Sequence, residues 1–160
     1  MENAWISIGA PVAVTHVYFF VQHSFINEDF VYLKEHSNII RFSVMIVHIA
    51  NDLGTYKREN ETGYTPKLIQ CFMNETGASE EEACEYMKSM MHTPWKKMDE
   101  EVCNSSLPES FKYIAINIAK MAMCLYQHGD GHTIQDPIIK SLIVSLIFQP
   151  IPYLYVQESC

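Results

Sequence analysis

Apolar residues recur at intervals of three and four over most of the chain, and this spacing predicts amphipathic α-helices. The pattern is clearest on one face of residues 108–127, with Phe111, Ile114, Ile118, Met121 and Leu125. No pair of alternating strands joined by a hairpin turn stands out. We therefore predict an all-α fold, with helices over residues 11–24, 27–37, 38–59, 66–75, 108–127 and 137–148 and a further helix that begins at Ser79.

Residues that favour helix ends lie at several of these boundaries. Pro66 suits a first helical turn, and Gly77 suits the position just after a last one. Ser79 followed by Glu82 forms a capping box. The final predicted helix stops before Pro150.

The N-terminal stretch "WISIGAPVAVTHVYFFV" is apolar but does not read as a targeting or membrane segment. Glu2 stands where a signal peptide has basic residues, and the Gly9 to Pro11 stretch interrupts the run. The run is also short for a bilayer span. We expect a buried helix with a break at "GAP", no membrane partner and no organelle-import leader.

Composition narrows the class of partner. The chain has 160 residues, of which 48% are hydrophobic, so a single globular domain is expected. A net charge of -8 disfavours nucleic-acid binding. The five cysteines are odd in number and form no C-x-x-C pair, which favours a reducing, intracellular compartment without a disulfide framework or zinc site.

One polar stripe has the chemistry of a metal site. In "HIANDLGTYKRENETGYTPK", Asn51, Thr55 and Glu59 are four residues apart and fall on one side of an α-helix. Their amide, hydroxyl and carboxylate oxygens suit Mg²⁺ or Mn²⁺, and such a sparse set suits a metal that also binds substrate phosphates. The alternative from spacing alone is a solvated polar helix face.

A second stretch, "YQHGDGHTIQDP", lies between two predicted helices and has the composition of a loop that closes over a site. Tyr126, Asp130 and His132 are candidate proton donors or acceptors there, and a purely structural turn is the alternative. His128 and His132 are not expected to bind metal, because the glycines between them break the helix that such a pair needs.

Four segments, taken together and in order, resemble a known family. They are "NDLGTYKRE", "TPKLIQCFMNETGASEEEA", "YQHGDGHTIQD" and "SLIFQPIP". They are similar to the C-terminal part of plant class I terpene synthases, most of all the monoterpene synthases of angiosperms, and the likeness covers essentially all 160 residues. The resemblance implies the C-terminal half of the class I terpene synthase helical bundle.

The resemblance also implies roles for the polar stripe. The family's NSE/DTE motif matches Asn51, Thr55 and Glu59, which would be Mg²⁺ ligands. Asp52 would lie next to these ligands without binding the metal itself. The metal ions would grip the diphosphate of a prenyl substrate, with geranyl diphosphate expected, and promote its ionisation to a carbocation. Lys67 is a weaker candidate for contacting the diphosphate.

Other family roles fall on the loop and on aromatic residues. The resemblance implies that Tyr126, Asp130 and His132 lie beside the pocket, with His132 expected to influence the final deprotonation. Aromatic faces would stabilise the carbocation. The candidates by position are Trp5, Tyr18, Phe20 and Tyr126.

The sequence departs from the family pattern in three ways. It contains neither the D-D-x-x-D motif nor the R-x-R motif. His48 replaces the usual arginine three residues before the motif, and a histidine lacks the guanidinium fork that binds phosphate. Gly9-Ala10 replaces the usual Ser-Gly.

These departures set two competing expectations. In the first, the 160 residues are roughly the last half of a catalytic domain, without the aspartate-rich helix and the N-terminal helical domain, and are inactive alone. In the second, the chain is a truncated, inactive paralogue that at most associates with intact synthases. Either way we expect exposed apolar faces that favour association. A full-length relative would be plastidic, with a cytoplasmic location left open for this chain.

Overall fold

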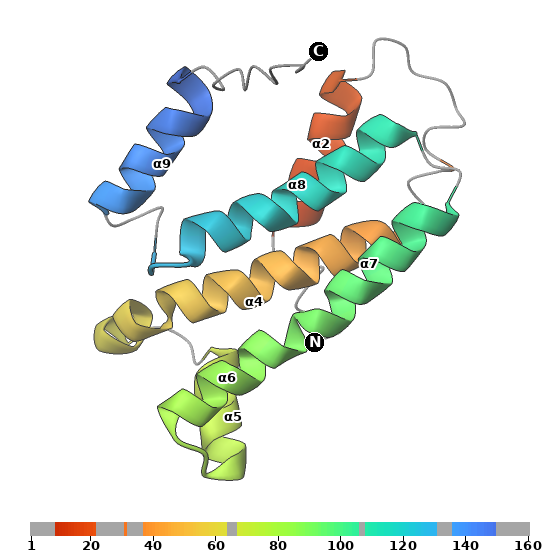
Figure 1. Cartoon of the computed structure of the whole chain (residues 1–160). Coiled ribbons are helices and arrows are strands. Elements are labelled where there is room, and N and C mark those ends of the chain that lie inside the picture. Colours follow the sequence, from red (N-terminus) through yellow and green to blue (C-terminus); the bar gives the residue numbers. More distant parts are fainter. Residues whose placement is uncertain are drawn as a thin grey trace, which may run out of the picture.

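The computed structural model describes residues 9–21, 31, 37–63, 67–105, 108–130 and 136–149, and the predicted all-α class is confirmed there (Figure 1). The helices are α2 (Ala10–Val21), α4 (Ser37–Thr62), α5 (Leu68–Thr76), α6 (Glu80–Met90), α7 (His92–Asn104), α8 (Glu109–Tyr126) and α9 (Pro137–Phe148). Of the predicted helix 27–37, only Val31 and Ser37 lie within the described residues.

Local sequence signals account for most of these boundaries. Gly77 ends α5 with a positive φ of 73°, and its N–H donates to the Met73 carbonyl. Ser79 and Glu82 form the predicted capping box at the start of α6. Asp136 caps α9, because its carboxylate accepts hydrogen bonds from the backbone N–H groups of Ile138 and Ile139.

The methionine-rich stretch after Ser79 forms two helices separated at Met91. Pro94 supplies a reason, because it has no N–H to donate to the carbonyl of Met90 and its ring crowds that carbonyl. The chain therefore ends α6 at Met90 and begins α7 at His92.

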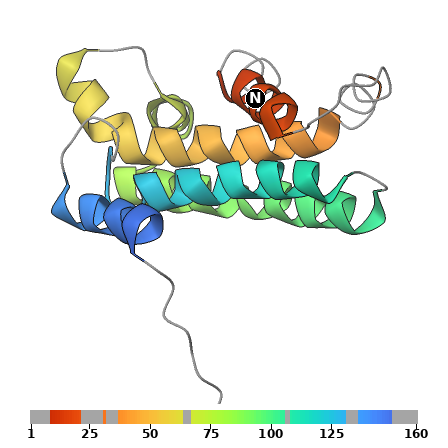
Figure 2. The ribbon, with the colours of Figure 1, turned by 90° about the horizontal axis from the view of Figure 1, so that it is seen from above.

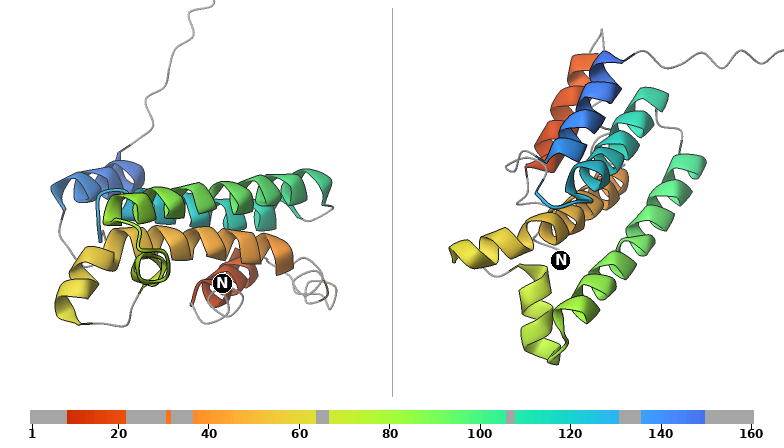
Figure 3. Two further views of the ribbon diagram at one scale, coloured as in Figure 1. Left: turned by 90° about the horizontal axis from the view of Figure 1, so that it is seen from below. Right: turned by 60° about the vertical axis from the view of Figure 1, so that its left-hand side comes forward.

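Helix α4 is the centre of the fold. Figures 2 and 3 show α8 and α7 running alongside it, while α2 packs across both α4 and α8, and α5 packs against α4 as well. Three clusters of buried side chains pack along its length, and α4 contributes Val44 to one, Ile46 to another and Ile49 to the third. Because α4 is covered on several sides, its polar stripe is held on a rigid element.

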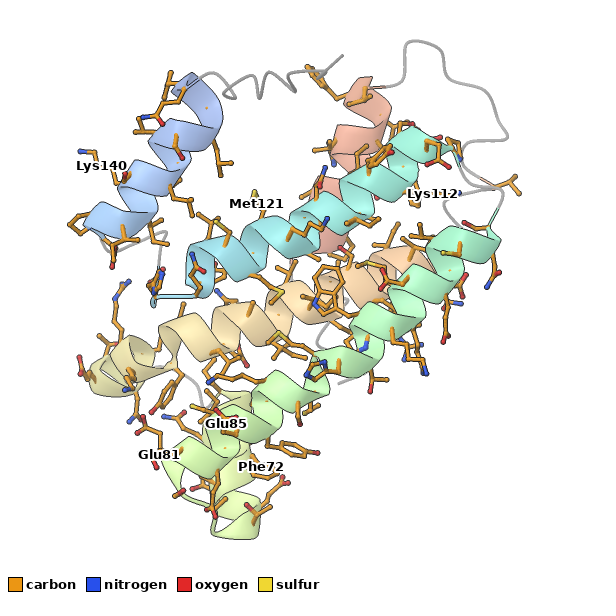
Figure 4. All side chains as sticks on the ribbon, viewed as in Figure 1. Phe72, Glu81, Glu85, Lys112, Met121 and Lys140 are labelled. Atoms are coloured by element: carbon orange, nitrogen blue, oxygen red, sulfur yellow. The ribbon has the colours of Figure 1, made fainter. Side chains whose placement is uncertain are left out.

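Small residues allow α8 to pack closely against α4. The buried positions of α8 include Ala115, Ala119 and Ala122, and the Ser43 hydroxyl of α4 donates to the Ala115 carbonyl over 2.6 Å. Met121, one of the residues whose spacing predicted this helix, is half exposed. Figure 4 shows Met121 on the side of α8 away from α4.

Apolar side chains are exposed on α2 and α9. The N-terminal stretch, which was expected to form a buried helix, is buried within α2 only at Ala10, Val14 and Tyr18. The large exposed ones on these helices are Val12, Val17, Phe20, Val21, Ile138, Val144, Leu146, Ile147 and Phe148. Whether these faces bind another chain stays a prediction. Within the described ranges, none of the helices is long and apolar enough to cross a membrane.

Candidate metal centre on helix α4

The three predicted metal ligands lie on the continuous helix α4. Thr55 is buried, whereas Asn51 and Glu59 are partly exposed. The Thr55 hydroxyl donates to the Asn51 carbonyl over 2.9 Å, so its hydrogen is used within the helix. Its oxygen lone pairs remain available to accept or to bind a cation.

Asp52 joins α4 to the start of α5. Asp52 is only 2% exposed, and its Oδ2 accepts a hydrogen bond from the backbone N–H of Leu68, the first residue of α5, over 3.2 Å. A carboxylate at this place also interacts favourably with the positive end of the helix dipole. Asp52 therefore has a structural function besides its place behind the stripe.

Lys67 links Asp52 to the predicted ligand Glu59. Its Nζ lies 2.9 Å from Glu59 Oε2 and 3.4 Å from Asp52 Oδ1. Burial acts to lower the pKa of the Lys67 ammonium, but the two carboxylates outweigh burial and raise it. The ammonium is thus held beside the polar stripe, where an anionic ligand of a metal would also lie.

His48 faces the same cluster. Its Nδ1 lies 3.9 Å from Asp52 Oδ1, one helical turn away, and its side chain is mostly buried. The imidazole is thus close to Asp52 and, through Asp52, to Lys67. Its contact with a diphosphate stays a prediction.

The end of α8 brings two of the three predicted loop residues to α4. Burial raises the pKa of the Tyr126 phenol and outweighs the opposing effect of a hydrogen bond with the Asn51 side chain, while the negative charges of Asp130 and Glu59 add to the rise. Asp130 is 7% exposed, and its Oδ2 accepts from Arg58 Nη1 over 2.6 Å.

Gly54 and Arg58 are the residues that sequence reasoning missed. A Cβ on Gly54 would lie 2.8 Å from Tyr126 Cδ1 and 2.9 Å from the Gly129 carbonyl oxygen. The sequence signal was a glycine inside a long helix, which is unfavourable unless another backbone comes close. Arg58 follows one turn later, but nothing in the sequence identifies Asp130 as its partner.

The remaining predicted residues lie elsewhere or outside the described residues. Tyr18 is buried in the core, where its ring meets that of Phe111 edge-on with the two ring centroids 5.1 Å apart. Phe20 is 88% exposed. Trp5 and His132 lie outside the described residues.

A cavity of about 760 Å³ lies beside α4, bordered also by α6 and the end of α8. Its α4 lining includes Leu53 and Lys57, which helical geometry turns well away from Thr55. Glu81 and Glu85 of α6, labelled in Figure 4, also line it. The cavity therefore opens away from Thr55, although Tyr126 and Gly129 line it as well.

The donor chemistry of the stripe fits a hard cation. Among the described residues, no cluster of three or more His, Cys, Asp or Glu side chains forms a metal site. The stripe instead offers amide, hydroxyl and carboxylate oxygens, which suit Mg²⁺ or Mn²⁺ and do not suit zinc. With one carboxylate among three donors, the stripe needs further anionic ligands to hold such a cation firmly.

Comparison with known families gives one consistent result. The family described as "Terpene synthase family, metal binding domain" matches residues 1–97. Myrcene synthase, chloroplastic, from Quercus ilex is 51% identical over 153 residues, which are 95% of this chain and 26% of that protein. The (-)-alpha-terpineol synthase of Vitis vinifera is 44% identical over 155 residues, covering 96% of this chain and 26% of its own length.

Solved structures show the same likeness. Limonene synthase with 2-fluorolinalyl diphosphate superposes with a TM-score of 0.84 at 35% identity, covering 94% of this chain and 28% of that one. Isoprene synthase of grey poplar (Populus x canescens), with three Mg²⁺ ions and dimethylallyl-S-thiolodiphosphate, gives 0.76 at 32% identity, covering 94% and 29%. The chain thus spans about a quarter of the length of the relatives it matches.

Proposed function

This chain belongs to the terpene synthase family, and we propose that it contributes the NSE/DTE metal wall and the α8 terminus of a monoterpene synthase. The reaction is the Mg²⁺-dependent ionisation and cyclisation of a prenyl diphosphate, with geranyl diphosphate as the expected substrate. The observation that carries the proposal is the position of Asn51, Thr55 and Glu59 on one helix, with Tyr126 and Gly129 packed against Gly54 of the same helix.

Asn51, Thr55 and Glu59 would hold one metal ion through oxygen. When bound, Mg²⁺ supplies positive charge that neutralises the diphosphate leaving group. Thr55 is prepared for this role because its hydrogen already points to the Asn51 carbonyl. Asp52 keeps its structural contacts with Leu68 and Lys67 and orients the stripe without binding the metal directly.

Lys67 would contact the diphosphate as a point charge. In the structure the Lys67 ammonium pairs with Glu59. A metal ion that binds Glu59 would therefore free the ammonium to contact the diphosphate. His48 lies one turn from Asp52 and would add a hydrogen bond, without the guanidinium fork that its family position usually supplies.

Tyr126, Asp130 and His132 would act at the other end of the reaction. Tyr126 would act from beside Asn51, and it also lines the cavity between α4 and α6. Asp130 fixes the position of the segment through Arg58. His132 remains our proposal for the group that influences the final deprotonation.

The activity belongs to a complete protein in which residues outside this chain supply the second acidic metal wall. We expect the isolated 160-residue chain to bind Mg²⁺ weakly and to be inactive. Because the relatives named above include a chloroplastic enzyme, we propose a plastid location for the complete protein.

Product formation from geranyl diphosphate and Mg²⁺ tests the proposal. The chain alone is compared with the chain joined to the upstream part of the Quercus ilex relative. We expect no product from the chain alone and terpene product from the fusion. Within the fusion, Thr55→Val and Glu59→Gln should abolish most of the activity, while Thr55→Ser retains it because the hydroxyl remains.

Two outcomes contradict the proposal. An active isolated chain would show that the second acidic wall is not needed. A fusion in which Thr55→Val and Glu59→Gln are as active as the parent would show that the stripe does not hold the catalytic metal.

A further inference from the structure

We propose that Gly54 and Arg58 are positioning residues that together hold the segment Tyr126–Asp130 against α4, with the Tyr126 hydroxyl beside the Asn51 side chain. Neither residue is a member of the metal motif, and neither touches the reacting atoms in the proposed reaction. The contact itself stands on the geometry alone. Its consequence for catalysis rests on the proposed function.

The first contact is a close approach that only glycine permits. Gly54 lies inside a 26-residue helix, where alanine is intrinsically more favourable. A Cβ there would come within 2.9 Å of both the Tyr126 Cβ and the Gly129 carbonyl oxygen. One of these neighbours is backbone, so a side chain at position 54 displaces the segment rather than a flexible tip.

The second contact is an ion pair one helical turn further along α4. Arg58 Nη1 donates to Asp130 Oδ2 over 2.6 Å, joining residues 72 apart in sequence. Asp130 is 7% exposed whereas the Arg58 side chain is 43% exposed, so the carboxylate is the buried partner. Loss of the guanidinium leaves a buried carboxylate with a much poorer charge balance.

The two contacts act on the two ends of one short segment. Gly54 meets Tyr126 and Gly129, and Arg58 meets Asp130. Both lie on α4 at positions four apart, beside Asn51 and Thr55 on the helix surface. The phenol of Tyr126 is therefore fixed relative to the metal stripe by residues that bind neither metal nor substrate.

Hydrogen exchange of the chain tests the contact directly. The amide of Gly129 donates to the Tyr126 carbonyl over 3.3 Å and reports on the segment. In Gly54→Ala and in Arg58→Met, we expect amides of residues 126–130 to exchange about tenfold faster or more, because local opening controls exchange. Amides in the middle of α4 and α8 should keep their parental rates, and Arg58→Lys should restore part of the protection.

Lys57→Met is the matched control. It removes a neighbouring cation of α4 whose side chain is 75% exposed and lies 3.4 Å from Glu80 of α6. We expect no change in the exchange of residues 126–130. Arg58→Met keeps the test decisive if Gly54→Ala does not fold.

Steady-state kinetics of the fusion test the positioning role. In Arg58→Met and Gly54→Ala, kcat should fall about tenfold while KM for geranyl diphosphate changes less than about twofold, since the segment contributes to the reacting geometry more than to diphosphate binding. Lys57→Met should leave both constants unchanged.

The outcomes separate this inference from the proposed function. Unchanged exchange of residues 126–130 in both variants, or loss of protection spread evenly through α4 and α8, overturns the contact. Faster exchange with an unchanged kcat overturns the positioning role. An inactive parental fusion refutes the proposed function, and exchange then decides the contact alone.

Discussion

Replacing Asp52 by alanine should weaken the junction between α4 and α5. The carboxylate accepts the Leu68 N–H at 3.2 Å and lies 3.4 Å from the Lys67 ammonium. Alanine removes both contacts and leaves the first N–H of α5 without its acceptor. The asparagine variant is the matched comparison, because its amide oxygen can still accept from Leu68 while the charge is gone.

The magnitude follows from these two contacts. A hydrogen bond to a charged acceptor contributes about 1.5–3 kcal/mol. The ion pair adds about 1 kcal/mol or less, because Lys67 keeps Glu59 as a partner at 2.9 Å. We therefore expect Asp52→Ala to lower the free energy of unfolding by about 2–4 kcal/mol, and Asp52→Asn by about 1 kcal/mol.

Urea unfolding of the chain followed by far-ultraviolet circular dichroism measures both values. With a slope of about 2 kcal/mol per molar urea, Asp52→Ala should lower the midpoint by about 1–2 M. Hydrogen exchange at the start of α5 should increase most. The reasoning is refuted if Asp52→Ala lies within about 0.5 kcal/mol of the parent, and an Asp52→Asn variant as unstable as Asp52→Ala would show that charge, not capping, dominates.

Three further predictions concern the scaffold. Phe111→Ala should lower the free energy of unfolding by about 3–5 kcal/mol, because it empties a buried site, and a loss below about 2 kcal/mol in urea unfolding contradicts this. Ser43→Val should lower the free energy of unfolding by about 1–3 kcal/mol and Ser43→Ala by about 1 kcal/mol. Both remove the hydrogen bond to the Ala115 carbonyl, but valine also adds volume where α4 meets α8. Equal unfolding midpoints for the two variants would contradict this. Hydrogen bonds from Ser79 lower the pKa of the Glu82 carboxyl below its ordinary value of 4.5. The stabilisation of α6 by this carboxylate is therefore present above pH 4.5 and is lost as the pH falls through the lower pKa of the folded state. An acid titration of helicity should show this loss in the parent and not in Glu82→Gln.

Much of the helical scaffold could be predicted because its signals are local. Pro137 and the apolar run after it gave the bounds of α9, and Gly77 gave the end of α5. The separation of α6 from α7 was not predicted, although Pro94 is a local signal for it. Apolar spacing predicted α8 itself but not the face that meets α4, where Ala115, Ala119 and Ala122 are buried while Met121 is half exposed.

The sequence by itself determined the helical scaffold and the oxygen stripe of Asn51, Thr55 and Glu59, because spacing on one helix is a property of consecutive residues. Only the tertiary structure decided what surrounds that stripe. Lys67 reaches Glu59 across a helix connection, and Asp130 meets Arg58 over 72 residues. Such contacts depend on how the helices pack, which no local pattern encodes.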